Sequence, residues 1–260
     1  MTPSTYVTDL TDDQWQLIKK LLPAPKPGGR PRTVCLRQTF NAMLYLLTTG
    51  CPWRQLPHAY PHWRTVYGYF VRWQHDGTWQ RLHNTLRAAV RRQEGRHKHP
   101  TAGCLDSQSI KSSHVPGSRG FDAFKRLTGR KRHLVVDTSG LLLAVCVTPA
   151  NVSETAGAVL VLPRLRGAAK KLRVLWCDSG YFNTAFAHAA QKRIQLRAVE
   201  RPSTQKGFAV LPRRWVVERT FAWLSRCRRL ARDYEVNPHS SETLILLAMS
   251  RLMLRRLAPL

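Results

Sequence analysis

Through the first 95 residues, apolar positions recur every three or four residues, which predicts a series of amphipathic helices. The first begins at Thr11, because Thr11 and Gln14 have the spacing of a capping box, and it ends at Pro23. The second ends at Gly50, a residue type that commonly closes a helix. The predicted helices cover residues 11–22, 37–49, 62–74 and 78–93. Residues 1–95 are therefore expected to form a small all-helical domain.

After a charged, irregular stretch at residues 94–101, the pattern changes to short apolar runs that are typical of strands. Strands are predicted over residues 103–111, 131–139, 141–149, 173–180 and 196–200, and helices over residues 151–165, 182–193, 212–229 and 241–257. Asn151 and Glu154 have capping-box spacing at the start of the helix after the third strand. This order is that of a ribonuclease-H-like α/β fold, a mixed five-stranded sheet with flanking helices. The domain is expected to cover residues 96–260, with the last helix against the sheet.

The charge balance points to a polyanionic partner. The 260 residues include 42 Lys and Arg against 15 Asp and Glu, a formal charge of +27. Double-stranded DNA is favoured over an anionic membrane surface, because the longest apolar runs are too short to span a bilayer. The first residues lack a basic segment followed by an apolar one, so the cytoplasm is the expected location. The six cysteines form no CxxC pair, and zinc is not expected.

Two carboxylates stand at the ends of apolar strands in a chain that is poor in acids. Asp106 follows the apolar start of the first predicted strand, and Asp178 ends the fourth. Because these strands are neighbours in the expected sheet, the two side chains should meet at one edge. Two close anions are tolerable when divalent cations lie between them, and oxygen ligands suit Mg²⁺, with Mn²⁺ as a substitute. A pair of such ions is the usual arrangement for phosphodiester chemistry.

A third carboxylate is expected from outside the strands. Glu218 is the best candidate, because it is the one acid in a basic and aromatic helix, and Arg214 precedes it by one turn. Asp137 is explained by a hairpin turn and Glu154 by helix capping, whereas Asp122 remains a competitor. The alternative for each residue is structural, since strand-end Asp often caps a turn and helical Glu often forms a surface ion pair.

Five segments in this order resemble bacterial insertion-sequence transposases of the DDE class, in the IS-five family. They are GCPWRQLP from Gly50, DSQSIKSS from Asp106, GFDAFKRLTGRKRHLVVDTSG from Gly120, DSGY from Asp178 and RRWVVERTFAWLSRCRRL from Arg213. The resemblance implies that Asp106, Asp178 and Glu218 are the catalytic, metal-binding triad. Leu211 and Ser225 stand where related transposases carry Tyr and Lys around the last acid, whereas Arg214 matches their Arg.

Several basic residues are candidates for binding DNA. Arg64 and Arg72 lie on the second helix of a possible helix-turn-helix, for which a purely structural bundle is the alternative. Residues 29–32 could form a minor-groove arm, although a solvated linker is favoured. A phosphate-binding role is favoured for Lys125, Arg126, Arg130, Lys131 and Arg132, which are expected just before the second strand, and Arg214 could contact a phosphate. Trp215 and Trp223 could stack on a displaced base, but core packing is favoured.

The resemblance implies nicking at the inverted repeats of an element and joining of the freed 3′-hydroxyl to target DNA. A homo-oligomer assembled on DNA is expected, because two element ends must be held together. Three alternatives stay open at this point. The chain could be an inactive DNA-binding regulator, a metal-dependent nuclease that does not join strands, or a membrane-surface protein.

Overall fold

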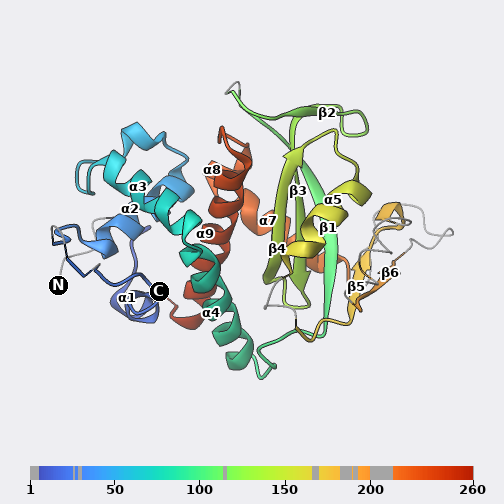
Figure 1. Ribbon diagram of the computed structural model, residues 1–260, viewed down its shortest axis with the longest axis horizontal. Coiled ribbons are helices and arrows are strands. Elements are labelled where there is room, and N and C mark those ends of the chain that lie inside the picture. Colours follow the sequence, from blue (N-terminus) through green and yellow to red (C-terminus); the bar gives the residue numbers. More distant parts are fainter. Residues whose placement is uncertain are drawn as a thin grey trace. The chain divides into compact units, whose positions relative to one another are not determined.

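The computed structural model describes residues 6–25, 27–28, 31–113, 116–165, 170–181, 189, 193–199 and 213–259 (Figure 1). The chain forms two compact units. The first comprises Met1–Arg96, Arg226–Leu230 and Thr243–Leu260, and the second comprises His97–Ser225 and Ala231–Glu242. The sequence placed residues 96–260 together, whereas two late segments group with the first unit in the structure.

Helices build the first unit, as the apolar pattern predicts. They are α1 (Asp12–Lys19), α2 (Leu36–Thr49), the short 3-10 helix η1 (Trp53–Gln55), α3 (Trp63–His75) and α4 (Thr78–Gln93). The capping box at Thr11 and Gln14 is confirmed, since each side chain accepts a hydrogen bond from the backbone N–H of the other. Gly50 closes α2 in the left-handed conformation, with φ of 76°. The first helix ends at Lys19, before the predicted stop at Pro23.

Aromatic side chains fill the core of this unit. The ring of Trp79 lies 5.4 Å from that of Trp73 and 5.7 Å from that of Phe40, measured between centroids. The indole N–H of Trp79 donates to the buried carbonyl of Phe70 at 3.1 Å, which satisfies its one polar group. This packing fixes the inner side of α3, so that its other side is left for solvent or a partner.

A mixed sheet forms the second unit, in the order predicted for a ribonuclease-H-like fold. Its strands are β1 (Ala102–Lys111), β2 (Gly120–Asp122), β3 (Leu127–Asp137), β4 (Leu142–Pro149), β5 (Val174–Cys177) and β6 (Gln195–Ala198). Strand β3 pairs antiparallel with β1 and β4, while β5 pairs parallel with β1 and β6. The five predicted strands are confirmed. The short β2, which pairs with the first residues of β3, was not predicted.

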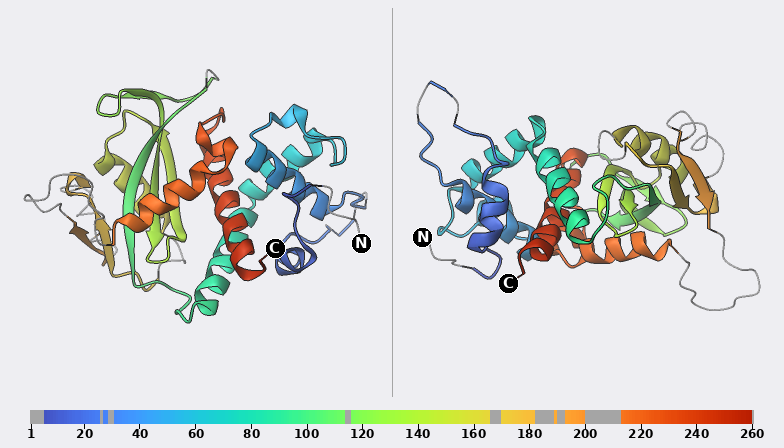
Figure 2. Two further views of the ribbon diagram at one scale, coloured as in Figure 1. Left: turned by 180° about the vertical axis from the view of Figure 1, so that it is seen from behind. Right: turned by 90° about the horizontal axis from the view of Figure 1, so that it is seen from below.

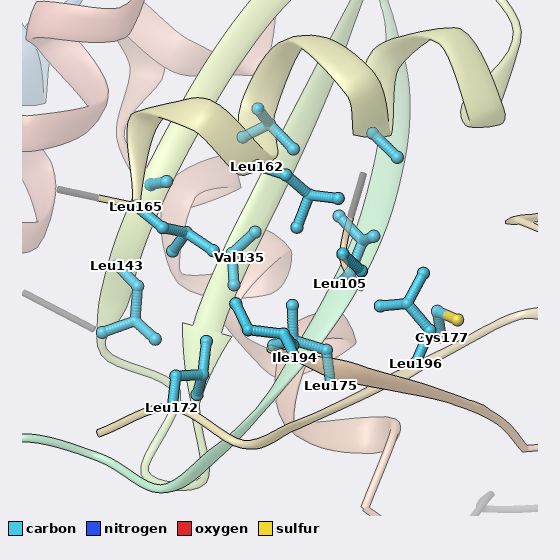
Figure 3. Packing of buried hydrophobic residues seen from close by; sticks show 14 of the residues in the cluster. Leu105, Val135, Leu143, Leu162, Leu165, Leu172, Leu175, Cys177, Ile194 and Leu196 are labelled. Atoms are coloured by element: carbon cyan, nitrogen blue, oxygen red, sulfur yellow. The ribbon is translucent and has the colours of Figure 1, made fainter. Parts of the chain in front are cut away.

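Helices α5 (Glu154–Val161) and α7 (Trp215–Ser225) cover opposite faces of the sheet. Figure 1 shows α5 in front of β3 and β4, and Figure 2 shows α7 against the other face. Apolar side chains from β1, β3, β4, β5 and β6 pack beneath α5, among them Leu105, Val135 and Leu175 (Figure 3). The side chain of Cys104, one residue before Leu105, lies on the other side and contacts the carbonyl of Arg213. Because successive side chains of β1 point to opposite faces of the sheet, the strand presents different residues to α5 and to α7.

Three predictions about the helices need correction or fall outside the described residues. Helix α5 is capped by Ser153, which accepts from the N–H of Ala156, so the predicted capping box of Asn151 and Glu154 is wrong. The predicted helix over residues 212–229 is two helices, α7 and α8 (Arg228–Ala231). The predicted helix over residues 182–193 lies almost wholly outside the described part. The remaining elements are the 3-10 helices η2 (Leu162–Arg164) and η3 (Ser179–Tyr181) and the last helix, α9 (Pro238–Leu257).

The last helix, α9, was expected to pack against the sheet. Its residues up to Glu242 belong to the second unit, whereas those from Thr243 onward belong to the first. None of the helices in the described part of the chain combines the length and the hydrophobicity that crossing a membrane requires.

Candidate active site

The parallel pairing of β1 and β5 brings Asp106 and Asp178 to one edge of the sheet. Cys104 is paired with Trp176, and each aspartate lies two residues further along its strand direction. Strand β5 ends at Cys177, so Asp178 begins the turn that leaves the sheet beside Asp106. The juxtaposition predicted from the sequence is therefore present in the structure.

A single guanidinium, that of Arg214, contacts both aspartates. Its Nη1 lies 2.7 Å from Oδ2 of Asp178, and its Nη2 lies 3.6 Å from Oδ2 of Asp106. Arg214 directly precedes α7 and is buried. Its guanidinium therefore interacts with the carboxylates more than with solvent. Charge-assisted bonds of this kind are among the strongest hydrogen bonds in proteins. The sheet edge thus holds a cation between two carboxylates.

The two carboxyl groups have pKa values shifted in opposite directions. Burial raises the pKa of Asp106 to about 6, although Arg214 and the N–H of Ser107 oppose the rise. Burial also acts to raise the pKa of Asp178, whose side chain is 43% exposed. There the guanidinium of Arg214 and hydrogen bonds from Gly180 and Ser179 prevail and hold the pKa below its ordinary value. Opposite shifts in adjacent acids are common at functional sites.

Glu218, the third predicted acid, lies in the first turn of α7 and is exposed to solvent. Burial acts to lower the pKa of Arg214, but the negative charges of Asp106, Asp178 and Glu218 raise it. The guanidinium therefore interacts electrostatically with all three acids. Among the residues that the structure describes, no three His, Cys, Asp or Glu side chains are grouped as a preformed metal cage. The structure thus brings the two aspartates together. Glu218 interacts electrostatically with Arg214, which contacts both aspartates.

Glu154 is a further acid at this edge, and the sequence assigned it only a capping role. Its Oε1 accepts a hydrogen bond from the hydroxyl of Ser107 at 3.1 Å, and its charge acts to raise the pKa of Asp106. A side chain on Gly180 would approach its Oε2 to 3.2 Å, which places Glu154 against the turn that follows Asp178. The signal that could have found it is topological, because the helix after β4 begins at the edge where β1 and β5 meet.

The other acids near this face have structural roles. Asp137 accepts from the N–H groups of Ser139 and Leu141, as expected of an acid that caps a hairpin turn. Asp122, the competitor left open by the sequence, accepts from Ser109 and forms an ion pair with Lys131 at 3.4 Å. These hydrogen bonds and its ion pair account for the burial of Asp122.

Three of the predicted phosphate-binding residues are buried. The sequence predicted that the strand begins at residue 131, within this basic run, but β3 begins at Leu127 and includes Arg130, Lys131 and Arg132. Arg130 forms an ion pair with Asp233 at 3.0 Å, with both side chains nearly inaccessible to solvent. A surface that follows DNA phosphates is therefore not formed by these three side chains. Lys125 and Arg126, in the turn before β3, are exposed.

Exposed arginines of α3 lie on aromatic rings in the first unit. The guanidinium carbons of Arg64 and Arg72 lie 5.4 Å and 5.3 Å from the ring centroids of Trp63 and Tyr69. Such contacts hold an arginine in place while it remains accessible. Both residues are thus available for DNA. In the predicted arm at residues 29–32, Gly29 and Arg30 are outside the described residues.

Trp215 and Trp223 enclose Arg219. The guanidinium carbon of Arg219 lies 4.5 Å from the Trp215 ring and 4.6 Å from the Trp223 ring. Arg219 also donates to the carbonyl of Ser139 at 3.1 Å. These contacts stack an arginine against both rings, and Trp215 is 39% exposed. Leu211, at the place of the family's tyrosine, is outside the described residues.

Comparison with known proteins matches both parts of the chain. Residues 97–253 match the family described as "Transposase DDE domain", and residues 10–83 match that described as "Putative transposase of IS4/5 family". The chain belongs to the DDE transposases of the IS4/5 type. The resemblance seen in the sequence is confirmed, and the mixed sheet is the one expected of a DDE transposase.

Two relatives of the chain come from Burkholderia cepacia. A putative transposase for insertion sequence element IS402 is 33% identical over 114 residues, which are 41% of this chain and 54% of the relative. An uncharacterized 16.2 kDa protein of insertion element IS402 is 36% identical over 94 residues, 32% of this chain and 60% of that protein. The chain spans little more than half the length of the curated relatives it matches. No solved structure matches the chain.

Proposed function

We propose that this chain is a transposase that nicks DNA at the inverted repeats of its element and joins the 3′-hydroxyl to target DNA. The observation that carries the proposal is the pair of carboxylates, Asp106 and Asp178, held at one sheet edge around the guanidinium of Arg214. Membership of the DDE transposases and the charge of +27 support it.

The residues at this edge fit Mg²⁺. Carboxylate oxygens are hard ligands of the kind that Mg²⁺ and Mn²⁺ take, and the ion pairs of Arg214 with both aspartates support a cation at this edge. Asp106 and Asp178 would hold the metal, with Glu218 as the third acid, and two ions are expected. Bound there, divalent cations would activate the attacking oxygen and stabilise the leaving one.

The chain's own side chains have separate tasks in this proposal. Asp178, with its lowered pKa, supplies a permanent negative charge near neutral pH. Arg214 is within reach of both aspartates and can instead bind a DNA phosphate when a metal neutralises them. Exposed Lys125 and Arg126 near the sheet, and Arg64 and Arg72 on α3, would contact the DNA backbone. A homo-oligomer assembled on two element ends completes the proposal.

The deciding experiment incubates the protein with labelled DNA that carries the ends of its element and with a target plasmid. Reactions contain Mg²⁺ or EDTA, and nicked and joined products are scored separately. Joined product that requires Mg²⁺ supports a transposase. Cutting without joining would indicate a nuclease, and binding without cutting in both Mg²⁺ and Mn²⁺ would indicate a DNA-binding regulator.

A further inference from the structure

A cavity of about 580 Å³ opens on the α5 face of the second unit, beside the carboxylates but outside them. It lies between the turn that joins β2 to β3, the loop after β4 and the start of α5. Its size falls within the range of about 300–1,000 Å³ that is usual for small-molecule sites. The lining residues that matter here are Phe121, Phe124, Lys131, Asn151, Glu154 and Gly180.

Two phenylalanines in the cavity wall are exposed to solvent. Phe124 is 99% exposed and Phe121 is 57% exposed, with Phe121 in the middle of β2 and Phe124 in the turn that follows it. Single exposed apolar residues are ordinary on protein surfaces, but two aromatic rings within four residues, both in the wall of one cavity, indicate a partner that covers them. Since Asp122 between them is buried and hydrogen-bonded, the turn that presents the rings is held in place.

The polar lining of the cavity is balanced in charge. It contains two cations, Lys125 and Lys131, and two anions, Asp122 and Glu154, in a chain whose formal charge is +27. Lys131 is engaged by the carbonyl of Val152 at 2.9 Å and by Asp122. A phosphate would find no surplus of positive charge here. Aromatic rings next to neutral hydrogen-bonding groups such as Asn151 suit a nucleobase, which stacks and hydrogen-bonds without carrying charge.

The cavity borders the carboxylates through two of its lining residues. The N–H of Gly180 donates to Oδ1 of Asp178 at 3.3 Å, and Glu154 accepts from Ser107, the residue after Asp106. A DNA strand bound at the aspartates therefore passes close to the cavity. Neighbouring nucleotides of one strand are separated by only about 3.4 Å along a duplex, so a base near the reacting phosphate is within reach once it leaves the stack.

We propose that this cavity binds an unpaired base of the DNA strand that lies at the carboxylates, with Phe124 and Phe121 as its stacking surface. The inference rests on the proposed function, because it requires DNA at Asp106 and Asp178. It adds a site for a single unstacked nucleotide, formed by the β2–β3 turn and the start of α5.

The test compares two labelled DNAs of the same arbitrary sequence, a perfect duplex and a duplex with one unpaired 5-iodouracil. The protein should bind the second DNA roughly five- to a hundredfold more tightly, the range that stacking of one base supplies. Phe124→Ala should lose that preference and keep its duplex affinity, while Phe124→Trp should retain the preference. The matched control is Leu160→Ala. It removes an exposed apolar side chain that lies on α5 and does not line the cavity. Irradiation should crosslink the iodouracil to the peptide that contains Phe121 and Phe124.

Any one of five results would overturn the proposal. The first is an unchanged preference in Phe124→Ala, and the second is a crosslink that maps away from the β2–β3 turn. The third is a free protein that changes from dimer to monomer in Phe124→Ala, because the rings would then bind a second copy of the chain. A protein that cuts and joins DNA without any preference for the unpaired base refutes the cavity alone. A protein that binds neither DNA refutes the proposed function as well.

Discussion

Arg214 donates to Asp178 at 2.7 Å while its other terminal nitrogen lies 3.6 Å from Asp106, so a side chain of the protein neutralises the acids that would bind metal. Asp106 is the more buried of the two, and burial raises its pKa to about 6. Without the guanidinium, two acids at one edge would repel each other. The pair of contacts therefore stabilises the folded protein before any metal arrives.

Replacing Arg214 should make the stability of the folded protein depend more strongly on Mg²⁺. In Arg214→Ala we expect the free energy of unfolding to fall by about 1–3 kcal/mol, less than for a fully buried pair because Asp178 is partly exposed. Mg²⁺ should then raise the melting temperature of the variant more than that of the parent, since it replaces the missing cation. Thermal unfolding with Mg²⁺ and with EDTA measures this. An equal effect of Mg²⁺ on both proteins would contradict it.

Loss of any acid of the proposed triad should stop chemistry and spare DNA binding. Asp106→Ala, Asp178→Ala and Glu218→Ala are each expected to lower the cleavage rate more than about a hundredfold, because a metal ligand supplies several kcal/mol of transition-state stabilisation. Duplex affinity should stay within about twofold of the parent, as the three acids bind no phosphate directly. Glu94→Gln removes an acid of the helical unit, one that pairs with Arg256, and is the matched control. A variant that cuts at the parental rate would remove its residue from the triad.

The position of the aspartates was predictable because it depends on strand order alone. The strand that contains Asp106 and the strand that precedes Asp178 could be read from short apolar runs, and their parallel pairing brings the two aspartates together. Glu154 was missed for the opposite reason. A glutamate at the start of a helix has a sufficient local explanation, and its contact with Ser107 spans 47 residues of sequence.

The burial of the basic run could not be predicted from its composition. Positive residues in series usually indicate a solvated or phosphate-binding surface. Arg130 is instead neutralised by Asp233, which lies 103 residues further along the chain, and donates hydrogen bonds to the carbonyl oxygens of Ser118 and Val236. Charge in a sequence shows what must be compensated, but the compensating group appears only when distant segments are folded together.

Substitution of Arg130 should affect the stability of the fold, whereas substitution of Arg126 should affect DNA binding. Arg130→Ala leaves the buried carboxylate of Asp233 without the cation of its ion pair, and we expect the free energy of unfolding to fall by about 3–5 kcal/mol. Arg126→Ala should leave stability unchanged, because its side chain is exposed, and should reduce the slope of log affinity against log salt by about one. Denaturant unfolding and salt titrations of duplex binding separate the two effects. A folded Arg130→Ala protein of parental stability with weakened DNA binding would restore the surface role predicted from the sequence.

His133 should make the second unit sensitive to mild acid. It is fully buried on β3, its Nε2 lies 3.0 Å from the hydroxyl of Thr148, and burial, with the charge of Lys131, lowers its pKa from 6.5 to about 4. The unfolded chain then binds more protons than the folded one between these values. Stability is therefore complete above about pH 6.5 and falls as the pH drops toward 4, by about 3 kcal/mol for this residue.

The measurement is the urea midpoint at several pH values for the parent and for His133→Gln. The variant is expected to be less stable at pH 7, since its side chain replaces a ring that packs against Gly157, where a Cβ atom would lie 1.9 Å from Cε1 of the histidine. The informative quantity is the slope of stability against pH between 4 and 6.5. That slope should be shallower in His133→Gln. It should not vanish, because His83 in the first unit is also buried and burial lowers the pKa of His83 to about 3. Identical slopes would mean that His133 is already protonated in the folded protein, and that its charge is compensated by a group other than Thr148.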